Sequence, residues 1–311
     1  MNPKYPTILD NTMRCSFLEC PRKLHWWLEG YDYEQTPPYF SFGICWGIIK
    51  QVWYSSGGHR MDFDSPERQA LAREALAKGL AHWQTLGTDN AIKPNDPETL
   101  TDLWNCYLET YPSEDIKMIA PEVGFTYPLG VIDGREVNIG GALDGYVSQE
   151  EIGVFALEEK TVGVYLSDGY ISSYTYSPQI TTYIWQGRKT IGEEFQGALV
   201  NMATKRILGP SAKTPQFART FQRRSEVELE EFEIDFKSFV KDFYQAIDED
   251  YFRKTANPIN CVGGVGKSPC LFRGLCASGI PYKDIDPLAF PFIVKKENWT
   301  WAPWTRGKDK Q

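Results

Sequence analysis

The chain has 311 residues, 42% of them hydrophobic, so it can bury a substantial core in one large domain or two smaller ones. No run approaches the roughly 18 apolar residues of a membrane span, so we expect no membrane association. The formal net charge of −8 argues weakly against a general nucleic-acid coat. The segment from Met1 to Pro6 lacks the layout of a signal peptide, so we expect a cytoplasmic protein.

The first third of the chain is predicted to be helical. We expect helical structure over 12–30, with a helix start at Pro21, because proline is tolerated in a first turn but not inside a helix. The apolar run 40–54 predicts a buried helix, and helical periodicity over 70–83 and 98–111 predicts two more. We interpret these helices as an insertion ahead of a sheet.

From Met118 onward the pattern changes to strands. Strands are predicted over 120–127, 137–147, 154–161, 195–207 and 217–221. Helices are predicted over 178–186 and 226–253. This order indicates a mixed α/β domain with its sheet in the middle of the chain.

The stretch 141–161 is predicted to be an antiparallel hairpin, because two apolar runs flank a short polar segment. If the turn centres near Glu151, Asp144 lies opposite Glu158. Side chains alternate between the two faces of a strand, so Glu158 and Lys160 share one face and Asp144 can join them. Two carboxylates and an ammonium group then meet where a core-facing sheet would prefer apolar groups.

Such a trio suits the hydrolysis of a phosphodiester. Asp144 and Glu158 offer the hard oxygen ligands that Mg²⁺ or Mn²⁺ prefers, and the main-chain carbonyl of Glu159 would point at the same metal. Lys160 can orient or deprotonate the attacking water and offset charge on the phosphate. The alternative is a solvated hairpin face with a weak Glu–Lys ion pair.

Two later segments add candidate site residues. Gln179 and Tyr183 lie four residues apart in a predicted helix, so they project from one helix face. The stretch 205–224 contains no acidic residue and six basic ones, which are Lys205, Arg206, Lys213, Arg219, Arg223 and Arg224. This stretch is either a phosphate-tracking surface or a solvated hairpin, and the two interpretations have equal weight.

The seven cysteines are an odd number, which argues against a disulfide framework in an intracellular chain. Cys261, Cys270 and Cys276 lie in a Gly/Pro-rich segment without apolar periodicity, as metal ligands on a loop would. Four thiolates complete a 4Fe-4S or Zn²⁺ site, and Cys20 is the candidate for the fourth. Ordinary reduced thiols are the alternative. The remaining cysteines are predicted to lie in the core, and they are Cys15, Cys45 and Cys106.

The ordered set of Asp144, Glu158-x-Lys160 and Gln179-x-x-x-Tyr183 resembles the PD-(D/E)XK nuclease superfamily. Within it the set is similar to the RecB-type exonucleases, which include the AddB nuclease domain and the CRISPR-associated RecB-like nucleases. The resemblance implies a restriction-endonuclease-like α/β fold, with a central mixed sheet flanked by helices, an N-terminal helical region and a Cys-ligated C-terminal loop.

The resemblance covers about residues 12–280 and implies roles for the matching residues. Asp144 and Glu158 would ligate the metal, and Lys160 would be the catalytic lysine. Gln179 and Tyr183 would help to place DNA and the other site residues.

Two further expectations follow from the same resemblance. Glu122 stands where many members have a strand carboxylate, so it would be a secondary metal ligand or a structural residue. The family's cysteine layout implies a structural 4Fe-4S cluster, whose ligands here would be Cys20, Cys261, Cys270 and Cys276.

One departure concerns a histidine. Members of this branch usually carry a metal-binding His in a Gly-x-x-x-His helix motif, whereas Gly43 is followed here by Gly47. The three histidines of the chain do not fit the motif, and they are His25, His59 and His82. The departure puts metal affinity and catalytic rate in question.

The main expectation is therefore a Mg²⁺- or Mn²⁺-dependent DNA exonuclease that prefers free ends. Its setting would be DNA recombination, repair, or phage or CRISPR DNA processing in a bacterial, archaeal or phage-infected cell, with a recombination or CRISPR protein as a possible partner. The alternatives are a catalytically weakened DNA-binding or scaffold protein and a zinc-stapled endonuclease. We expect one nuclease-like domain over 1–311, with a helical region (12–115), a catalytic core (118–225), a long helix and cluster-binding tail (226–285) and a C-terminal tail (286–311).

Overall fold

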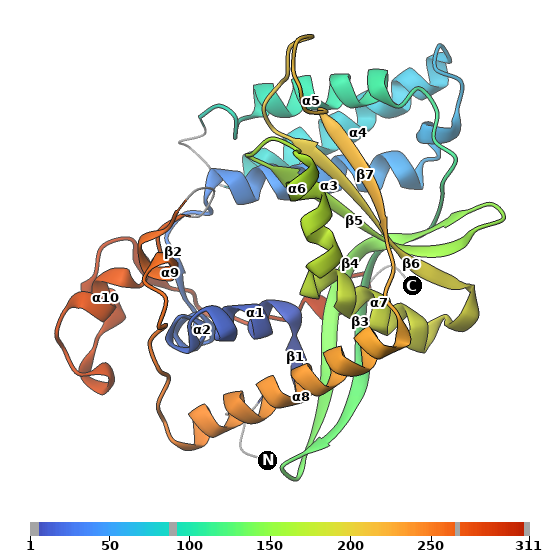
Figure 1. Cartoon of the computed structure of the whole chain (residues 1–311). Helices are drawn as coiled ribbons and strands as arrows, with labels where there is room; N and C mark the ends of the chain where they lie inside the picture. The colour runs from blue at the N-terminus through green and yellow to red at the C-terminus, as the bar shows by residue number, and fades with distance from the viewer. Residues whose placement is uncertain (1–5, 87–91, 265–267, 308–311) are drawn as a thin grey trace. The chain divides into compact units, whose positions relative to one another are not determined.

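The computed structural model describes residues 6–86, 92–264 and 268–307, which fall into two compact units (Figure 1). The first unit comprises Met1–Glu34, Phe125–Gly141 and Glu226–Thr305. The second unit comprises Gln35–Gly124, Ala142–Ser225 and Arg306–Gln311. Each unit is therefore assembled from segments that lie far apart in the sequence.

The second unit contains a mixed sheet. Its strands follow the order β4-β5-β6-β7, where β5 is antiparallel to β4 and parallel to β6, and β6 is antiparallel to β7. The strand bounds are β3 (Lys117–Ile132), β4 (Arg135–Gln149), β5 (Gly153–Val162), β6 (Phe195–Thr204) and β7 (Phe217–Gln222). The paired strands β3 and β4 continue from one unit into the other.

Helices flank this sheet, as Figure 1 shows. Their bounds are α3 (Pro38–Ser55), α4 (Pro66–Thr85), α5 (Pro97–Thr110), α6 (Asp168–Ser172) and α7 (Pro178–Thr190). Helices α4, α5 and α7 each begin with a proline. The residue before each proline caps the helix: the side chains of Ser65, Asp96 and Ser177 accept a hydrogen bond from a main-chain N–H of the first turn. The predicted mixed α/β architecture, with a central mixed sheet flanked by helices, is confirmed.

The helices α3, α4 and α5 pack on one face of the sheet through large apolar side chains. Trp46, Trp53 and Trp104 are almost fully buried and belong to one cluster with Phe155 and Leu157 of β5. Helix α7 packs against β5 and β6. The strand β5 is therefore covered by helices, and polar groups on it lie in partly dry surroundings.

The first unit contains the N-terminal helices and the long helix α8. Its further elements are β1 (Ile8–Asp10), α1 (Asn11–Glu19), α2 (Pro21–Leu28), β2 (Tyr31–Tyr33), α8 (Glu226–Asp248), α9 (Ile259–Val262), α10 (Arg273–Ala277) and β8 (Ile293–Lys295). The ring of Phe17 in α1 contacts the rings of Phe239 and Phe243 in α8. β1 pairs in parallel with the Asn138–Gly140 part of β4, and β2 pairs antiparallel with β8.

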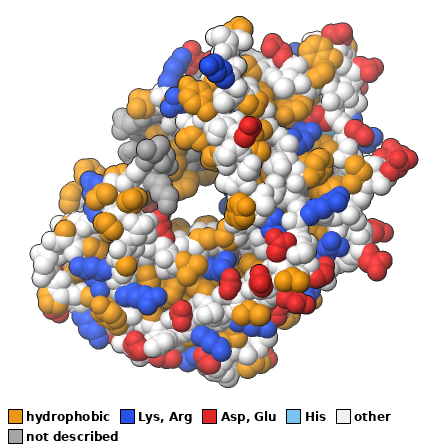
Figure 2. Space-filling model, in the orientation of Figure 1, with side chains coloured by type: hydrophobic (Ala, Val, Ile, Leu, Met, Phe, Trp, Pro, Cys, Tyr) orange, Lys and Arg blue, Asp and Glu red, His pale blue; other side chains and the backbone are white. Residues whose placement is uncertain are grey.

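The outer surface of α8 carries many charges, and Figure 2 shows acidic and basic side chains mixed over it.

In the described part of the chain, none of the helices combines the length and apolarity that crossing a membrane requires.

Several predicted bounds need correction. Residues 12–30 form two helices that meet at Cys20, because the chain is extended there before Pro21 opens α2. Helix α8 ends at Asp248, five residues before the predicted end, and β6 ends at Thr204 instead of 207. Cys15 is exposed on α1, so its predicted core position was wrong, whereas Cys45 is buried and Cys106 is half-buried.

Candidate active site

The hairpin of β4 and β5 has the predicted register. Gly145 pairs with Leu157, and one step further along the same register Asp144 faces Glu158. A Cβ atom at Gly145 would lie 2.7 Å from the carbonyl oxygen of Ala120. Glycine at this position therefore lets β3 approach β4 closely, directly beside Asp144.

The side chains of β5 alternate between two faces. Phe155, Leu157 and Glu159 point toward the helical core, because the first two belong to the cluster built by α3, α4 and α5. Glu158 and Lys160 lie on the opposite face, where the Lys160 ammonium forms an ion pair with the Glu158 carboxylate. Glu158 is only 3% exposed, whereas the Lys160 side chain is 31% exposed, so the carboxylate is buried and its counter-charge is half-buried.

Asp144 lies in a setting that disfavours its charge. Burial and the neighbouring charge of Glu158 together raise the pKa of Asp144 to about 8, although the Glu159 N–H and the Lys160 ammonium lower it. That N–H donates a 2.7 Å hydrogen bond to Oδ2 of Asp144. A divalent cation would favour the charged form of this carboxyl, and Asp144 and Glu158 carry the oxygen donors that Mg²⁺ or Mn²⁺ prefers.

Lys160 remains charged. Burial lowers its pKa, but the adjacent Glu158 carboxylate outweighs that effect, and the pKa is raised overall. An ammonium group with a raised pKa is suited to orienting water and stabilising negative charge. It is less suited to removing a proton.

A path of hydrogen bonds ties this lysine to α7 and back to β4. Nζ of Lys160 donates to Oε1 of Gln179 at 3.0 Å, and Nε2 of Gln179 donates to the Tyr183 hydroxyl at 2.8 Å. The Tyr183 hydroxyl in turn donates to the carbonyl oxygen of Ala142 at 2.7 Å. Because Ala142 precedes Asp144 by two residues, the path fixes both sides of the candidate site. The structure thus brings together the predicted catalytic residues, which are Asp144, Glu158, Lys160, Gln179 and Tyr183.

The two other residues proposed for the metal are Glu159, through its main-chain carbonyl, and Glu122, and their side chains lie elsewhere. The Glu159 side chain points to the opposite face of β5, where its Oε1 accepts a 2.7 Å hydrogen bond from Asn201. Only its main chain faces Asp144. Glu122 has a positive φ of 46° and accepts a hydrogen bond from Gln51 of α3 at 3.1 Å.

Sequence reasoning missed a buried charged network behind the site. Nζ of Lys50 lies 3.7 Å from Glu159, and Arg219 forms an ion pair with Glu114. Burial lowers the pKa of Lys50 to about 8, although the Glu159 charge opposes this. Three polar side chains complete the network, and they are Tyr54, Tyr107 and Asn201. Lys50 in the apolar run 40–54 was the one available signal, whereas Glu114 gave none.

The five basic residues expected to bind DNA have different surroundings. Arg219 belongs to the buried network, and Lys205 is 4% exposed and donates to Tyr39 and Asn95. Arg224 is buried and donates to the Thr181 hydroxyl and the Tyr174 carbonyl. Arg206 and Arg223 are exposed.

The position of the missing histidine lies on α3. Gly43, Gly47 and Gln51 are spaced by four residues and share one helix face. A Cβ atom at Gly43 would lie 3.6 Å from the Thr161 hydroxyl on β5, and Gln51 reaches Glu122 on β3. A Cβ atom at Gly47 would have no described atom within 4 Å, so this position between the two strands is open.

The four candidate cluster ligands all lie in the first unit. The N–H of Cys270 donates to the carbonyl of Cys261 at 3.0 Å, and Lys254 donates to the carbonyl of Cys276. Burial raises the pKa of the Cys270 and Cys276 thiols, and the charges of Cys20 and Cys261 raise both further. Four thiolates are the donor set that an iron–sulfur cluster or zinc ion takes, but the described side chains of these cysteines are not gathered as a group that could hold a metal ion.

Metal geometry itself is not preformed. Among the residues that the structure describes, no three His, Cys, Asp or Glu side chains stand together so that they could hold one metal ion.

Comparison with known proteins gives fold-level likenesses only. No family model and no curated protein matches the sequence. The crystal structure of SSO0001 is similar with a TM-score of 0.31 and 12% identity, covering 76% of this chain and 86% of that one. An alkaline exonuclease from Laribacter hongkongensis, LHK-Exo, is similar with a TM-score of 0.28 and 15% identity, covering 63% of this chain and 94% of that one. Identities and TM-scores this low assign no activity.

Proposed function

We propose that this protein is a Mg²⁺- or Mn²⁺-dependent deoxyribonuclease that hydrolyses DNA from free ends. The observation that supports the proposal most directly is the hydrogen-bonded path from Lys160 through Gln179 and Tyr183 to the strand that carries Asp144. Burying Glu158, and half-burying Asp144 and Lys160 beside it, costs free energy that an apolar sheet face would not cost. A polar constellation of this kind in a sheet core is therefore expected to have a chemical role.

The metal would be held by Asp144 and Glu158, with the main-chain carbonyl of Glu159 as a further ligand. When bound, such a cation neutralises charge on the phosphate and makes an attacking water more acidic. The residues' part would be to hold it: Asp144 would bind it as the charged carboxylate, and Glu158 would share its charge between the metal and Lys160.

Lys160 would act as a fixed positive charge beside the scissile phosphate. Gln179 accepts a hydrogen bond from the ammonium group, which restricts its rotation. N–H groups that are not used in this bond can orient water or a phosphate oxygen. Tyr183 holds Gln179 in place and so positions the lysine indirectly.

Arg206 and Arg223 would contact DNA phosphates, since both are exposed. Lys205, Arg219 and Arg224 would contribute indirectly, by shaping the β6–β7 region that presents them. The setting that we propose is DNA recombination, repair, or phage or CRISPR DNA processing in the cytoplasm, with a recombination or CRISPR protein as a partner.

The four cysteines would bind a structural 4Fe-4S cluster, with zinc as the alternative. Such a centre would join the start of α2, at Cys20, to the segment that contains Cys261, Cys270 and Cys276. Binding would stabilise the first unit, because the unfolded chain loses conformational freedom when distant thiolates share one centre.

A second candidate function is DNA binding or scaffolding with weakened catalysis. The observation that favours it is Gly47, because this open helix position offers no side chain to the metal. A third candidate is an endonuclease whose four cysteines bind zinc instead of a 4Fe-4S cluster and whose substrate needs no free DNA end.

A cleavage assay tests the proposal. Protein purified without oxygen is incubated with Mn²⁺ and either linear or circular DNA, with Lys160→Ala alongside. Lys78→Ala is the matched control, because Lys78 is exposed on α4 and outside the basic stretch. Degradation of linear DNA only, abolished in Lys160→Ala and retained in Lys78→Ala, is the expected result. Cleavage of circles indicates an endonuclease, and no cleavage by cluster-loaded protein favours the scaffold.

A further inference from the structure

The segment that connects β5 to α7 is rich in tyrosine. Between Gly163 and Ser177 it contains Tyr165, Tyr170, Tyr174 and Tyr176, which are four of the chain's 17 tyrosines. We call Gly163–Ser177 the tyrosine segment. It begins three residues after Lys160 and ends two residues before Gln179, so both of its ends meet the candidate active site.

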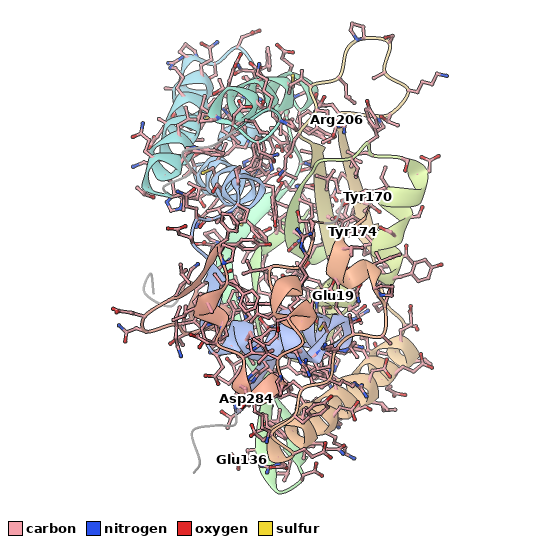
Figure 3. The ribbon with its side chains drawn as sticks, turned by 90° about the vertical axis from the view of Figure 1, so that its left-hand side faces the viewer. Glu19, Glu136, Tyr170, Tyr174, Arg206 and Asp284 are labelled. Atoms are coloured by element: carbon pink, nitrogen blue, oxygen red, sulfur yellow. The ribbon has the colours of Figure 1, made fainter. Side chains whose placement is uncertain are left out.

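The segment leads directly into α7, whose Gln179 accepts a hydrogen bond from Lys160 of that site. Two of the segment's side chains lie inward of the others, since Tyr170 is half-buried and Tyr174 is buried. The Tyr170 and Tyr174 rings meet edge-on at 5.9 Å, with their hydroxyls 3.4 Å apart (Figure 3). These two half-buried and buried rings form the inner part of the tyrosine segment.

Basic side chains hold the tyrosine segment at both ends. Nε of Arg206, labelled in Figure 3, donates to the carbonyl of Gly163 at 3.1 Å. Nη2 of Arg224 donates to the carbonyl of Tyr174 at 3.2 Å. A loop anchored in this way loses little conformational entropy when a ligand binds.

The outer two rings face solvent. Tyr165 is 51% exposed and Tyr176 is 84% exposed. The Arg206 guanidinium carbon lies 5.1 Å from the Tyr165 ring centroid, so a positive charge is stacked beside an exposed aromatic ring. Aromatic rings with an adjacent arginine are the elements with which proteins bind single-stranded nucleic acid, by stacking bases and neutralising phosphates.

The exposed rings favour contact with unpaired bases over contact with a duplex. The bases inside a duplex offer no free face to a tyrosine ring, whereas an unpaired strand does.

We propose that the tyrosine segment binds unpaired bases of a DNA strand next to the candidate active site, so that the substrate is single-stranded at the point of cleavage. This inference rests on the proposed nuclease function and specifies its substrate.

Binding is measured by fluorescence anisotropy in the cleavage-deficient Lys160→Ala protein. The probes are a labelled oligothymidine, an abasic strand of equal length and a blunt duplex. Tyr165→Ala and Tyr176→Ala are compared with Tyr165→Phe, which keeps the ring. Tyr251→Ala is the matched control, because Tyr251 is also 51% exposed but lies outside the tyrosine segment.

Each alanine variant is expected to weaken oligothymidine binding about fivefold or more, which corresponds to at least ~1 kcal/mol per stacked base. Binding of the abasic strand should change little, and Tyr165→Phe and Tyr251→Ala should bind like the parent. An equal loss on the abasic strand or the duplex would overturn the inference, because the contact would then be with the backbone. Unchanged oligothymidine binding overturns it as well. If the wild-type chain still cleaves DNA in a Lys160-dependent manner, the nuclease function survives that result.

Discussion

Arg219 offers the sharpest test of how the charges of the second unit are arranged. Its guanidinium group pairs with Glu114, donates to Asn201 at 2.7 Å and lies 4.8 Å from the Tyr111 ring centroid. In Arg219→Met, two buried carboxylates, Glu114 and Glu159, would be left with Lys50 as their only nearby counter-charge in the network. Removing one partner of a buried ion pair costs about 3–5 kcal/mol, because the other charge stays desolvated.

We therefore expect Arg219→Met to lower the unfolding free energy by about that amount. The Tm should fall by roughly 5–8 °C, because an unfolding entropy of about 2.1 cal/mol/K per residue amounts to about 0.65 kcal/mol/K for 311 residues. Thermal unfolding followed by circular dichroism measures the change. Arg223→Met is the control, because Arg223 is exposed in the same segment and should change stability by about 0.5 kcal/mol or less. Adding Glu114→Gln to Arg219→Met should recover part of the loss, with a coupling energy of about 0.5–3 kcal/mol.

A different result would refute this reasoning. If Arg219→Met melts like the wild type and instead weakens DNA binding, the arginine contacts nucleic acid and the network does not depend on it. Additive losses in the double variant would also refute it, since they would mean that the two charges do not interact.

Four further predictions concern other groups. Burial lowers the pKa of Lys205 to about 8. Between about pH 8 and 10.5 the unfolded chain therefore binds more protons than the folded one, so the free energy of unfolding rises with pH by up to about 1.4 kcal/mol per pH unit. Urea unfolding at several pH values should show this rise in the wild type and not in Lys205→Met. Because Asp144 has a raised pKa of about 8, Mn²⁺ affinity should rise about tenfold per pH unit below that value and level off above it, with proton release detected by calorimetry in different buffers. Gly47→His should increase Mn²⁺ affinity on the order of tenfold, and Gly47→Ala should not. Cys276→Ser should lose bound iron or zinc and melt at a lower temperature, as measured by elemental analysis and calorimetry.

Each of these predictions has an outcome that contradicts it. An unchanged pH slope in Lys205→Met would mean that the lysine keeps an ordinary pKa. Mn²⁺ binding that is independent of pH would separate Asp144 from the metal. Equal affinities for the two Gly47 variants would place this helix position out of reach of the metal, and full metal content in Cys276→Ser would end the cluster assignment.

The sequence predicted the elements that have strong periodicity. The hairpin around Asp144 and Glu158 was predicted with its register, because alternation over two apolar runs and a short polar turn leaves few alternatives. The pairing of Gln179 with Tyr183 followed from helix geometry alone. The three-residue strands β1, β2 and β8 were not predicted, since so short a stretch shows no alternation.

The surroundings of charged residues were harder to predict than the strands. Arg219 and Arg224 lie in a stretch without acidic neighbours in sequence, yet their partners Glu114 and Tyr174 come from distant segments. A basic stretch in sequence shows where positive charge is located, but the burial of each residue depends on pairing between strands that are not adjacent in the chain. For the same reason Lys50 gave no hint of its carboxylate partner.

The two faces of β5 carry charge at the same level, with Glu158 and Lys160 on one side and Glu159 on the other. If the strand slipped by one residue, Glu159 would enter the candidate site and Glu158 or Lys160 would enter the aromatic pocket around Lys50. Both exchanges would break ion pairs in surroundings where an unpaired charge is expensive. Lys50 therefore helps to fix the register of β5, because a misaligned hairpin would separate it from Glu159. The same pairing determines which side chains of β5 face the candidate site.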